Sequence, residues 1–201
     1  MLTIGDSNGA MENGWVDQLK QIRFNDHNYN TSISGNTIGF MNNGDPRLNT
    51  LHNIDNYMSS AIDHLKGLDA LIITLGTNDC KIVFKDSINL VSENLKELIG
   101  MIRAHDAYKA SQPRIFIVSP PPFGIASHSH DEFVHANERM LRLYPELKKT
   151  ALSEGCTFID IKSQLDGVID HLTSDGIHLH AEGQRLMAEI ISQEIDKYDL
   201  D

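Results

Sequence analysis

The sequence predicts an α/β fold, a three-layer α/β/α sandwich whose central sheet is mostly parallel. Short apolar runs such as residues 68–75 and 114–119 stop at glycine or proline and have the length of strands. The stretches between these runs carry apolar residues at helical spacing. Strands that are separated by helices form βαβ units with right-handed crossovers, and such units place the strands parallel to one another.

Four apolar runs and one weaker segment are the predicted strands. Residues 68–75 read Leu-Asp-Ala-Leu-Ile-Ile-Thr-Leu, a nearly continuous apolar run that suits a strand buried on both faces. The segment 25–51 is rich in Asn, Gly, Ser and Thr, which is typical of loops, and it contains only one short possible strand. In chain order, the predicted strands are residues 2–4, 29–33, 68–75, 114–119 and 157–161.

Five amphipathic stretches are the predicted helices. In the first of them, Trp15, Leu19 and Ile22 fall at helical spacing, so we expect Trp15 to lie in the core. One of the later helices contains Pro145, where we expect a break. The predicted helices are residues 12–23, 50–65, 86–110, 134–154 and 181–198.

Length and composition fit one domain that spans residues 1–201. Apolar residues make up 40% of the chain, enough for a full core without cross-links or metal. The net charge of −11 argues against a nucleic-acid or anionic-membrane surface, since both need clustered Lys and Arg. No run approaches the ~18 apolar residues of a membrane span. We expect Cys80 and Cys156 to be buried free thiols.

The start of the chain bears on its compartment. Few residues precede the first predicted strand, whereas many enzymes of this size carry several there. A leader removed from a periplasmic or secreted protein is therefore slightly favoured over a cytoplasmic location. The oligomeric state is left open.

Four short runs carry residues suited to chemistry, and their order is more informative than any one of them. Ser7 lies at the exit from the first strand into a loop, and Asn78 follows the strand 68–75. Both therefore fall at the carboxyl edge of the predicted sheet, where sites form in α/β proteins. Taken alone, Ser7 could be a turn or helix-capping residue and Asn78 a turn residue. The runs are residues 5–8, 32–36, 76–79 and 175–178.

Ser7 and His178 are a candidate nucleophile and base. A serine hydroxyl is a poor nucleophile until a base accepts its proton. Asp175 precedes His178 by three residues with Gly176 between them, so its carboxylate can accept from Nδ1–H and leave Nε2 facing the serine. The alternatives are an exposed loop histidine and a helix-capping aspartate.

Three groups could stabilise an oxyanion: the N–H of Ser7, the N–H of Gly35 and the side-chain amide of Asn78. Gly35 permits close backbone approach because it has no side chain, although it could also be a left-handed turn residue. We expect Asp6 and Asp79 to support these loops without reacting.

With these residues the chain resembles the SGNH, or GDSL-type, hydrolases over nearly its whole length. The family's four sequence blocks match residues 5–7, Gly35, 76–79 and 175–178. The resemblance implies a flavodoxin-like sandwich that requires no metal and no cofactor. It also implies a nucleophile, a base with its carboxylate partner, and oxyanion donors, which are Ser7, His178 with Asp175, and Ser7, Gly35 and Asn78.

One departure from the family pattern follows the serine. Asn8 replaces the aliphatic residue that is common there, and we expect it to line the pocket without affecting the catalytic roles. Residues 45–49, 75–79 and 118–122 are similar to the bacterial arylesterase and perhydrolase branch, but the loop after Ser7 is much shorter here. The candidate substrate-binding residues are Asn8, Arg47, Phe123, His128 and His130, with a surface salt bridge as the alternative for Arg47.

A histidine cluster follows the proline run at residues 120–122. A metal site could use His128, His130 and His135, but the sequence places no third ligand beside the first two, so we expect no metal. We expect a mobile loop near the site, in which His128 or His130 contacts the substrate.

These residues predict a serine esterase that forms an acyl-enzyme and acts on small-molecule or carbohydrate esters with short, acetyl-sized acyl groups. The loops 25–51 and 123–132 are polar, as a sugar cleft would be, and no additional apolar run suggests an acyl-chain tunnel. A lysophospholipase or acyl thioesterase is the alternative within the enzyme class. A carbohydrate-binding module with a decayed site is the alternative from another class.

Overall fold

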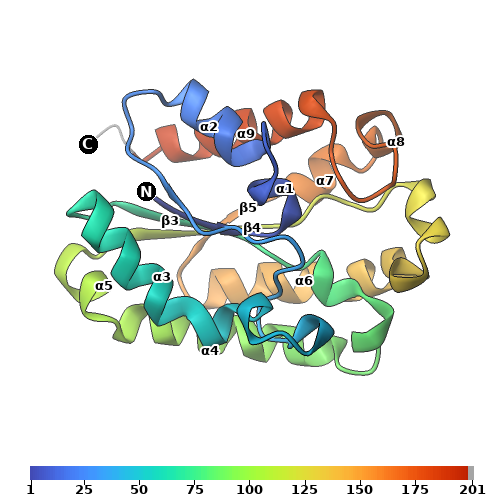
Figure 1. Cartoon of the computed structure of the whole chain (residues 1–201), viewed down its shortest axis with the longest axis horizontal. Helices are drawn as coiled ribbons and strands as arrows, with labels where there is room; N and C mark the ends of the chain where they lie inside the picture. The colour runs from blue at the N-terminus through green and yellow to red at the C-terminus, as the bar shows by residue number, and fades with distance from the viewer. Residues whose placement is uncertain (199–201) are drawn as a thin grey trace.

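The computed structural model describes residues 1–198 and has a five-stranded sheet at its centre (Figure 1). The strands pair in parallel throughout, in the order β2-β1-β3-β4-β5, which is the flavodoxin-like order. The predicted α/β fold is therefore confirmed, and residues 199–201 of the expected domain lie outside the described range. The strands are β1 (Leu2–Gly5), β2 (Tyr29–Asn30), β3 (Ala70–Thr74), β4 (Arg114–Val118) and β5 (Thr157–Ile159).

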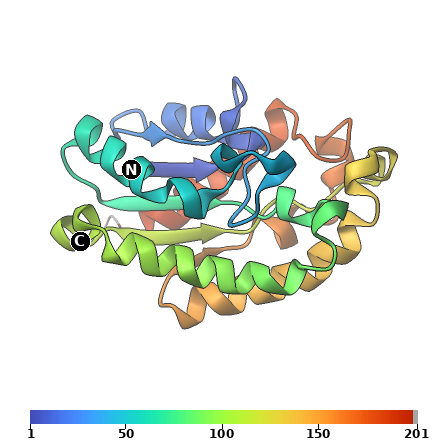
Figure 2. The same cartoon turned by 60° about the horizontal axis from the view of Figure 1, so that its bottom comes forward.

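Helices cover both faces of the sheet and complete the three layers (Figures 1 and 2). On one face α2 (Trp15–Ile22) packs against α9 (Ala181–Asp196). On the other face lie α3 (Thr50–Leu65), α4 (Val91–Ala104) and α6 (Ala136–Ser153). Among residues 1–198, no helix combines the length and the apolar character that crossing a lipid bilayer would require.

Short helical segments connect these elements, most of them at the edge of the sheet where the strands end. The short α-helices are α1 (Ser7–Ala10), α5 (Asp106–Ser111), α7 (Ile161–Leu165) and α8 (Ile169–Leu172). The 3₁₀ helices are η1 (Asn42–Gly44), η2 (Pro46–Leu48), η3 (Asn78–Cys80), η4 (Ile82–Phe84), η5 (Ile88–Leu90), η6 (Ile125–Ser129) and η7 (Asp131–Phe133).

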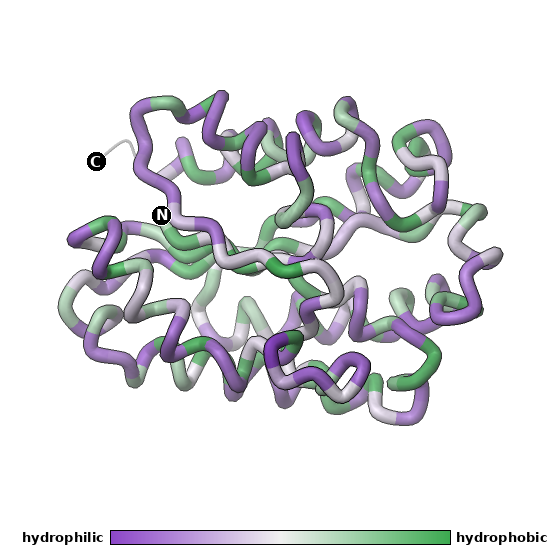
Figure 3. The backbone as a smooth tube through the Cα atoms, in the orientation of Figure 1, coloured by the Kyte–Doolittle hydropathy of each residue, from purple (hydrophilic) through white to green (hydrophobic). Residues whose placement is uncertain are grey.

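The core has two halves because alternate residues of each strand face opposite helical layers. Leu71 and Ile73 of β3 pack in the half formed with α3, α4 and α6. Ala70 and Ile72 pack in the half formed with α9 and Trp15, which is fully buried as predicted. In Figure 3 the apolar residues gather along the central strands, while the surrounding helices alternate apolar and polar residues. Both faces of the sheet are thus buried, which explains the nearly continuous apolar runs in the sequence.

The prediction of one helix over residues 86–110 was wrong. The chain instead forms α4 and α5, with His105 between them in an extended conformation at ψ 141°. The Nδ1 atom of His105 accepts a hydrogen bond of 3.1 Å from the N–H of Ala107. A side chain that satisfies an N–H of the first turn favours the start of a new helix, so the apolar periodicity continues through a break in the backbone.

The expected break at Pro145 is absent, because α6 is continuous from Ala136 to Ser153. Proline removes one helical hydrogen bond, the one to the carbonyl of Leu141 four residues earlier. Leu141 is exposed, so water can satisfy its carbonyl. The other predicted elements are present, most of them with shorter ends, although α3 has the predicted bounds and β1 extends one residue further, to Gly5. Cys80 and Cys156 are buried free thiols, as predicted.

Two carboxyl groups are buried where β1 and β3 end. The Asp6 carboxylate accepts the N–H of Asn8 at 3.0 Å, and the two oxygens of Asp79 accept the N–H of Ile38 at 3.1 and 3.3 Å. Burial raises the pKa of both carboxyls, that of Asp79 to about 7, and the nearby charge of Asp6 raises the pKa of Asp79 further. These bonds hold the loops that carry Ser7 and Asn78.

The raised pKa of Asp79 predicts that stability falls as the pH rises. Between about pH 4 and pH 7 the carboxyl is ionised in the unfolded chain but stays protonated in the folded chain. The free energy of the unfolded state therefore falls relative to that of the native state as the pH rises. We expect the free energy of unfolding to fall from pH 5 to pH 8, with Asp79 contributing on the order of 1 kcal/mol per pH unit below its pKa. Urea titrations at several pH values measure this decline.

Asp79→Asn should remove much of the decline, because the amide has no proton to lose and its oxygen can still accept from Ile38. Asp63→Asn, which removes an exposed carboxyl of α3, is the matched control and should keep the wild-type decline. Equal slopes for Asp79→Asn and the wild type would show that Asp79 is not the group responsible.

Candidate active site

Ser7 begins the short helix α1 directly after β1. The strand ends at Gly5, and Asp6 then caps the helix, because its carboxylate accepts the N–H of Asn8 and its carbonyl accepts the next two N–H groups. The sequence predicted a loop at Ser7, and the cap is the reason that a helix forms instead. Ser7 is half-buried at the carboxyl edge of the sheet.

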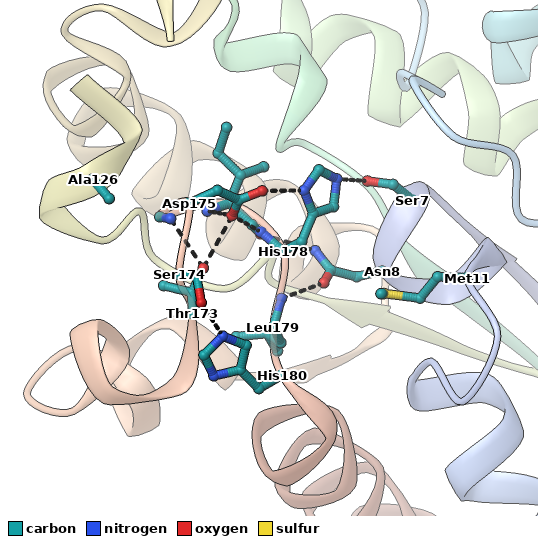
Figure 4. A network of polar contacts seen from close by, with 12 residues as sticks. Ser7, Asn8, Met11, Ala126, Thr173, Ser174, Asp175, His178, Leu179 and His180 are labelled. Atoms are coloured by element: carbon teal, nitrogen blue, oxygen red, sulfur yellow. Dashed lines mark hydrogen bonds and ion pairs between the residues drawn. The ribbon is translucent and has the colours of Figure 1, made fainter. Parts of the chain in front are cut away.

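The hydroxyl of Ser7 lies against the ring of His178, although 171 positions separate them in the sequence (Figure 4). Ser7 Oγ is 3.0 Å from His178 Nε2, and His178 Nδ1 is 2.6 Å from Asp175 Oδ2. A carboxylate that accepts from Nδ1–H leaves Nε2 free to accept a proton from the serine. The structure thus brings together the candidate nucleophile, base and carboxylate that the sequence predicts.

Asp175 is held in place through its second oxygen. Oδ1 accepts hydrogen bonds from the N–H of Ile177 at 2.8 Å, the N–H of His178 at 2.7 Å and the hydroxyl of Thr173 at 3.1 Å. Partial burial raises the pKa of Asp175, but the hydrogen bonds from His178 and Ile177 outweigh burial and hold the pKa well below its usual range. The carboxylate is therefore ionised at neutral pH and can orient the imidazole.

Residues 173–180, which we call the His178 loop, require glycine at position 176. Gly176 has a φ of +78°, and a Cβ there would lie 2.2 Å from the backbone nitrogen of Ser127. Its carbonyl accepts the N–H of Gly124 at 3.0 Å. The segment after β4 is thus packed directly on the His178 loop.

The candidate oxyanion donors come from the loops after β1, β2 and β3. Gly35 has a φ of +85°, which favours glycine, and its carbonyl accepts from the side chain of Asn42 at 2.7 Å. The amide of Asn78 gives one N–H to the carbonyl of Asn36 at 3.1 Å, and it has a second N–H to offer. Within residues 1–198 no acceptor takes the N–H of Ser7 or of Gly35, so both remain available to a substrate oxygen.

Asn36 joins these three loops, a role that was not predicted from the sequence. Its carbonyl accepts from Asn78, its amide donates to the carbonyl of Gly5 at 3.2 Å, and its side-chain oxygen accepts from Thr50 at 3.2 Å. Asn36 is completely buried. The available signal was its position directly after Gly35, but a polar residue in an Asn-rich loop does not stand out.

The expectation that Asn8 lines the pocket was wrong. Asn8 is only 1% exposed, and its amide bonds the backbone on both sides of His178. Its side chain points from α1 toward the His178 loop (Figure 4), and its burial shows that it does not face solvent. A helix of four residues has too little periodicity for its buried side to be read from sequence.

Two more candidate substrate-binding residues are engaged in other contacts of the protein. Phe123 is buried in the core, with its ring centroid 5.5 Å from that of Phe133, so its expected role was wrong. The guanidinium of Arg47 is paired with Asp45 at 2.6 Å on the surface, which was the alternative considered for it. This pairing raises the pKa of Arg47 and lowers the pKa of Asp45.

His128 and His130 are exposed on the segment after β4, at η6 and just beyond it. This segment is hydrogen-bonded to α8, because the N–H of Ile125 donates to the side chain of Asp170 at 2.6 Å. His135 pairs with Glu138 at 2.9 Å. Across residues 1–198, no group of three or more His, Cys, Asp or Glu side chains is arranged to hold a metal ion.

This arrangement has the parts needed for acyl transfer through serine. A hydroxyl that is hydrogen-bonded to a neutral imidazole can give its proton to the imidazole as its oxygen attacks a carbonyl carbon. N–H donors beside the hydroxyl can stabilise the negative charge that then develops on the carbonyl oxygen.

Comparison with solved structures shows the same fold in known esterases. Est24, a carbohydrate acetylesterase from Sinorhizobium meliloti, has a TM-score of 0.77 at 21% identity, covering 98% of each chain. The native aryl esterase of M. smegmatis has a TM-score of 0.75 at 22% identity, covering 98% of this chain and 97% of that one. At these identities the likeness establishes a shared fold.

Comparison with sequences identifies the family. No curated protein sequence gives a significant match. The family model of the GDSL-like lipase/acylhydrolase family matches residues 2–186, nearly the whole chain. This match covers all four runs of chemically suited residues and, with the fold, supports an ester-hydrolysing enzyme. The chain therefore belongs to the GDSL-like lipase/acylhydrolase family.

Proposed function

We propose that residues 1–201 form one catalytic domain, which hydrolyses short-chain carboxylic esters, acetyl esters of carbohydrates above all, through an acyl-enzyme on Ser7. The observation that carries this proposal is the chain of contacts from Ser7 Oγ to His178 Nε2 at 3.0 Å and from His178 Nδ1 to Asp175 at 2.6 Å. Donors that can stabilise an oxyanion lie on the neighbouring loops.

In the first half of the reaction, Ser7 Oγ attacks the ester carbonyl while His178 Nε2 accepts its proton. The negative charge on the former carbonyl oxygen is stabilised by the N–H groups of Ser7 and Gly35 and by the amide of Asn78. Asp175 stabilises the imidazolium that forms. His178 then protonates the alcohol as the ester C–O bond breaks, which leaves the acyl group on Ser7.

In the second half, a water molecule takes the place of the alcohol. His178 accepts a proton from this water as its oxygen attacks the acyl carbon. The same donors stabilise the second oxyanion, and its collapse releases the carboxylic acid and returns the proton to Ser7.

Two observations favour a small, polar substrate. One of the proteins that share the fold is described as a carbohydrate acetylesterase. The loop residues 25–51 are rich in side chains that bond hydroxyl groups, and Ser34 beside Gly35 is exposed. Sugar hydroxyls need such donors and acceptors at the rim.

A longer acyl chain is the second candidate substrate, because a recess with a partly apolar lining lies between η1 and η4. Its volume is about 190 Å³, and Met41, Ile82 and Val83 contribute its apolar lining. The recess borders on η1, whose residue Asn42 donates a hydrogen bond to the carbonyl of Gly35. It also borders on η4, which follows Asn78 closely in the sequence. A lysophospholipase or acyl thioesterase would use such a surface.

Acyl-chain length separates these two candidates. We expect p-nitrophenyl acetate to give a kcat/KM at least about tenfold above that of p-nitrophenyl octanoate, because a small site gains nothing from added methylenes. We also expect acetate release from acetylated sugars. Val83→Asp, which places a charge at the exposed edge of the recess, should leave acetate cleavage unchanged. Faster octanoate cleavage that Val83→Asp abolishes would overturn the short-chain proposal.

Loss of the Asn78 amide tests the oxyanion role. Asn78→Ala should lower kcat by about 10²–10³-fold with little change in KM, the usual scale for one lost donor. Asn53→Ala is the matched control, since it removes an amide that donates to the carbonyls of Pro46 and Asn49. The control should keep kcat within about twofold of wild type. A similar kcat for Asn78→Ala and Asn53→Ala would exclude Asn78 as an oxyanion donor.

A further inference from the structure

The side chain of Asn8 connects the helix that carries Ser7 to the loop that carries His178. Its Nδ2 atom donates to the carbonyl of Ile177 at 3.2 Å, and its Oδ1 atom accepts the N–H of Leu179 at 2.9 Å (Figure 4). These two peptide groups flank His178 on either side. One amide therefore holds the backbone immediately before and immediately after the candidate base.

An amide is well suited to this position because it carries one donor side and one acceptor side. Both bonds are buried, since Asn8 is 1% exposed. An aliphatic side chain would leave a buried carbonyl at Ile177 and a buried N–H at Leu179 without partners. The backbone around His178 would then have to move to find other partners or water.

Gln184, at the start of α9, fixes the orientation of the Asn8 amide. Its Nε2 atom donates to Asn8 Oδ1 at 2.8 Å, while its Oε1 atom accepts the N–H of Trp15 at 2.8 Å. Asn8 Oδ1 thus receives two donors, and its Nδ2 must face the carbonyl of Ile177. Gln184 is itself 1% exposed, so this support is enclosed in the core between α2 and α9.

We infer that Asn8 is a positioning residue that sets the distance between Ser7 Oγ and His178 Nε2, with Gln184 supporting it. This inference rests on the proposed roles of Ser7 and His178. Asn8 is covalently next to Ser7 and hydrogen-bonded on both sides of His178, so the path between nucleophile and base is short and rigid. A displacement of about 1 Å between reacting groups is enough to cost on the order of 10²-fold in rate.

The His178 loop has other attachments, so the fold does not depend on Asn8 alone. The N–H of His180 donates to the carbonyl of Leu172 at 2.7 Å, and the N–H of Gly124 donates to the carbonyl of Gly176 at 3.0 Å. Replacing Asn8 should therefore shift His178 within a loop that remains folded.

Asn8→Leu, which has a similar volume and no polar atoms, is the first test. With p-nitrophenyl acetate, we expect kcat to fall on the order of 10–100-fold while KM stays within about twofold, because the substrate-binding groups are untouched. Ser119→Ala is the matched control, since Ser119 is also a buried side chain that bonds a distant backbone N–H, that of Lys162 at 2.8 Å. This control should keep kcat, although it loses stability. A wild-type kcat for folded Asn8→Leu would overturn the inference.

The decisive measurement makes the Asn8→Leu substitution in a variant that lacks His178. An effect that acts through His178 disappears when His178 is absent, so Asn8→Leu should change kcat by less than about twofold in a His178→Ala background. A general loosening of the site would lower kcat in both backgrounds by the same factor, and that result would contradict a positioning role.

If Asn8→Leu does not fold, Gln184→Met provides the test, since it keeps the Asn8 amide and removes the hydrogen bond that supports it, together with the bonds of Gln184 to Trp15 and Leu179. It should lower kcat severalfold at constant KM, again only when His178 is present, and an unchanged kcat would overturn the inference. Ser7→Ala separates this inference from the proposed function. Full activity in Ser7→Ala would refute the acyl-enzyme, whereas an inactive Ser7→Ala beside a fully active Asn8→Leu would refute the positioning role alone.

Discussion

The parallel pairing of β1 with β3 is the constraint on which the candidate site depends. Gly5 at the end of β1 is in register with Thr74 at the end of β3, so the segments with Ser7 and Asn78 leave the sheet at the same edge. The site is complete only when the His178 loop, from the other end of the chain, reaches this edge. The 3.0 Å contact of Ser7 with His178 therefore requires the whole sandwich to be folded.

Buried polar side chains turn this edge into a rigid frame. A buried polar group without a partner is costly, so each of these side chains fixes the backbone that it bonds. Asp79 holds the loop at Ile38, Asn36 joins the loops after three strands, and Asn8 holds the backbone on both sides of His178. Catalysis by prearranged donors needs such a frame, because the donors must already be in place when charge develops on the substrate. The raised pKa of Asp79 is a cost of the same burial.

The fold and the linked residues Ser7, His178 and Asp175 could be predicted because both leave local signals in the sequence. The periods of apolar residues in the strands and helices predict the sandwich. The short runs at Ser7 and His178 each hold their chemically suited residues within a few positions of one another. The errors concern contacts between distant segments. Asn8 was expected to line the pocket because it replaces the aliphatic residue common after the serine, and the four residues of α1 are too few for a period that would reveal its buried side. The break at His105 depends on one capping bond, and Phe123 contacts Phe133 across a loop whose course no periodicity describes.

Labelling with a fluorophosphonate tests the central claim most directly, because the reagent reacts with an activated serine hydroxyl and needs no knowledge of the natural ester. The labelled peptide is identified by mass spectrometry. We predict that the wild type is modified once, at Ser7, that Ser7→Ala is unmodified, and that His178→Ala is modified far more slowly. Modification of Ser7→Ala at the wild-type rate, or of folded wild type at another serine only, would contradict the assignment of Ser7 and His178 as nucleophile and base.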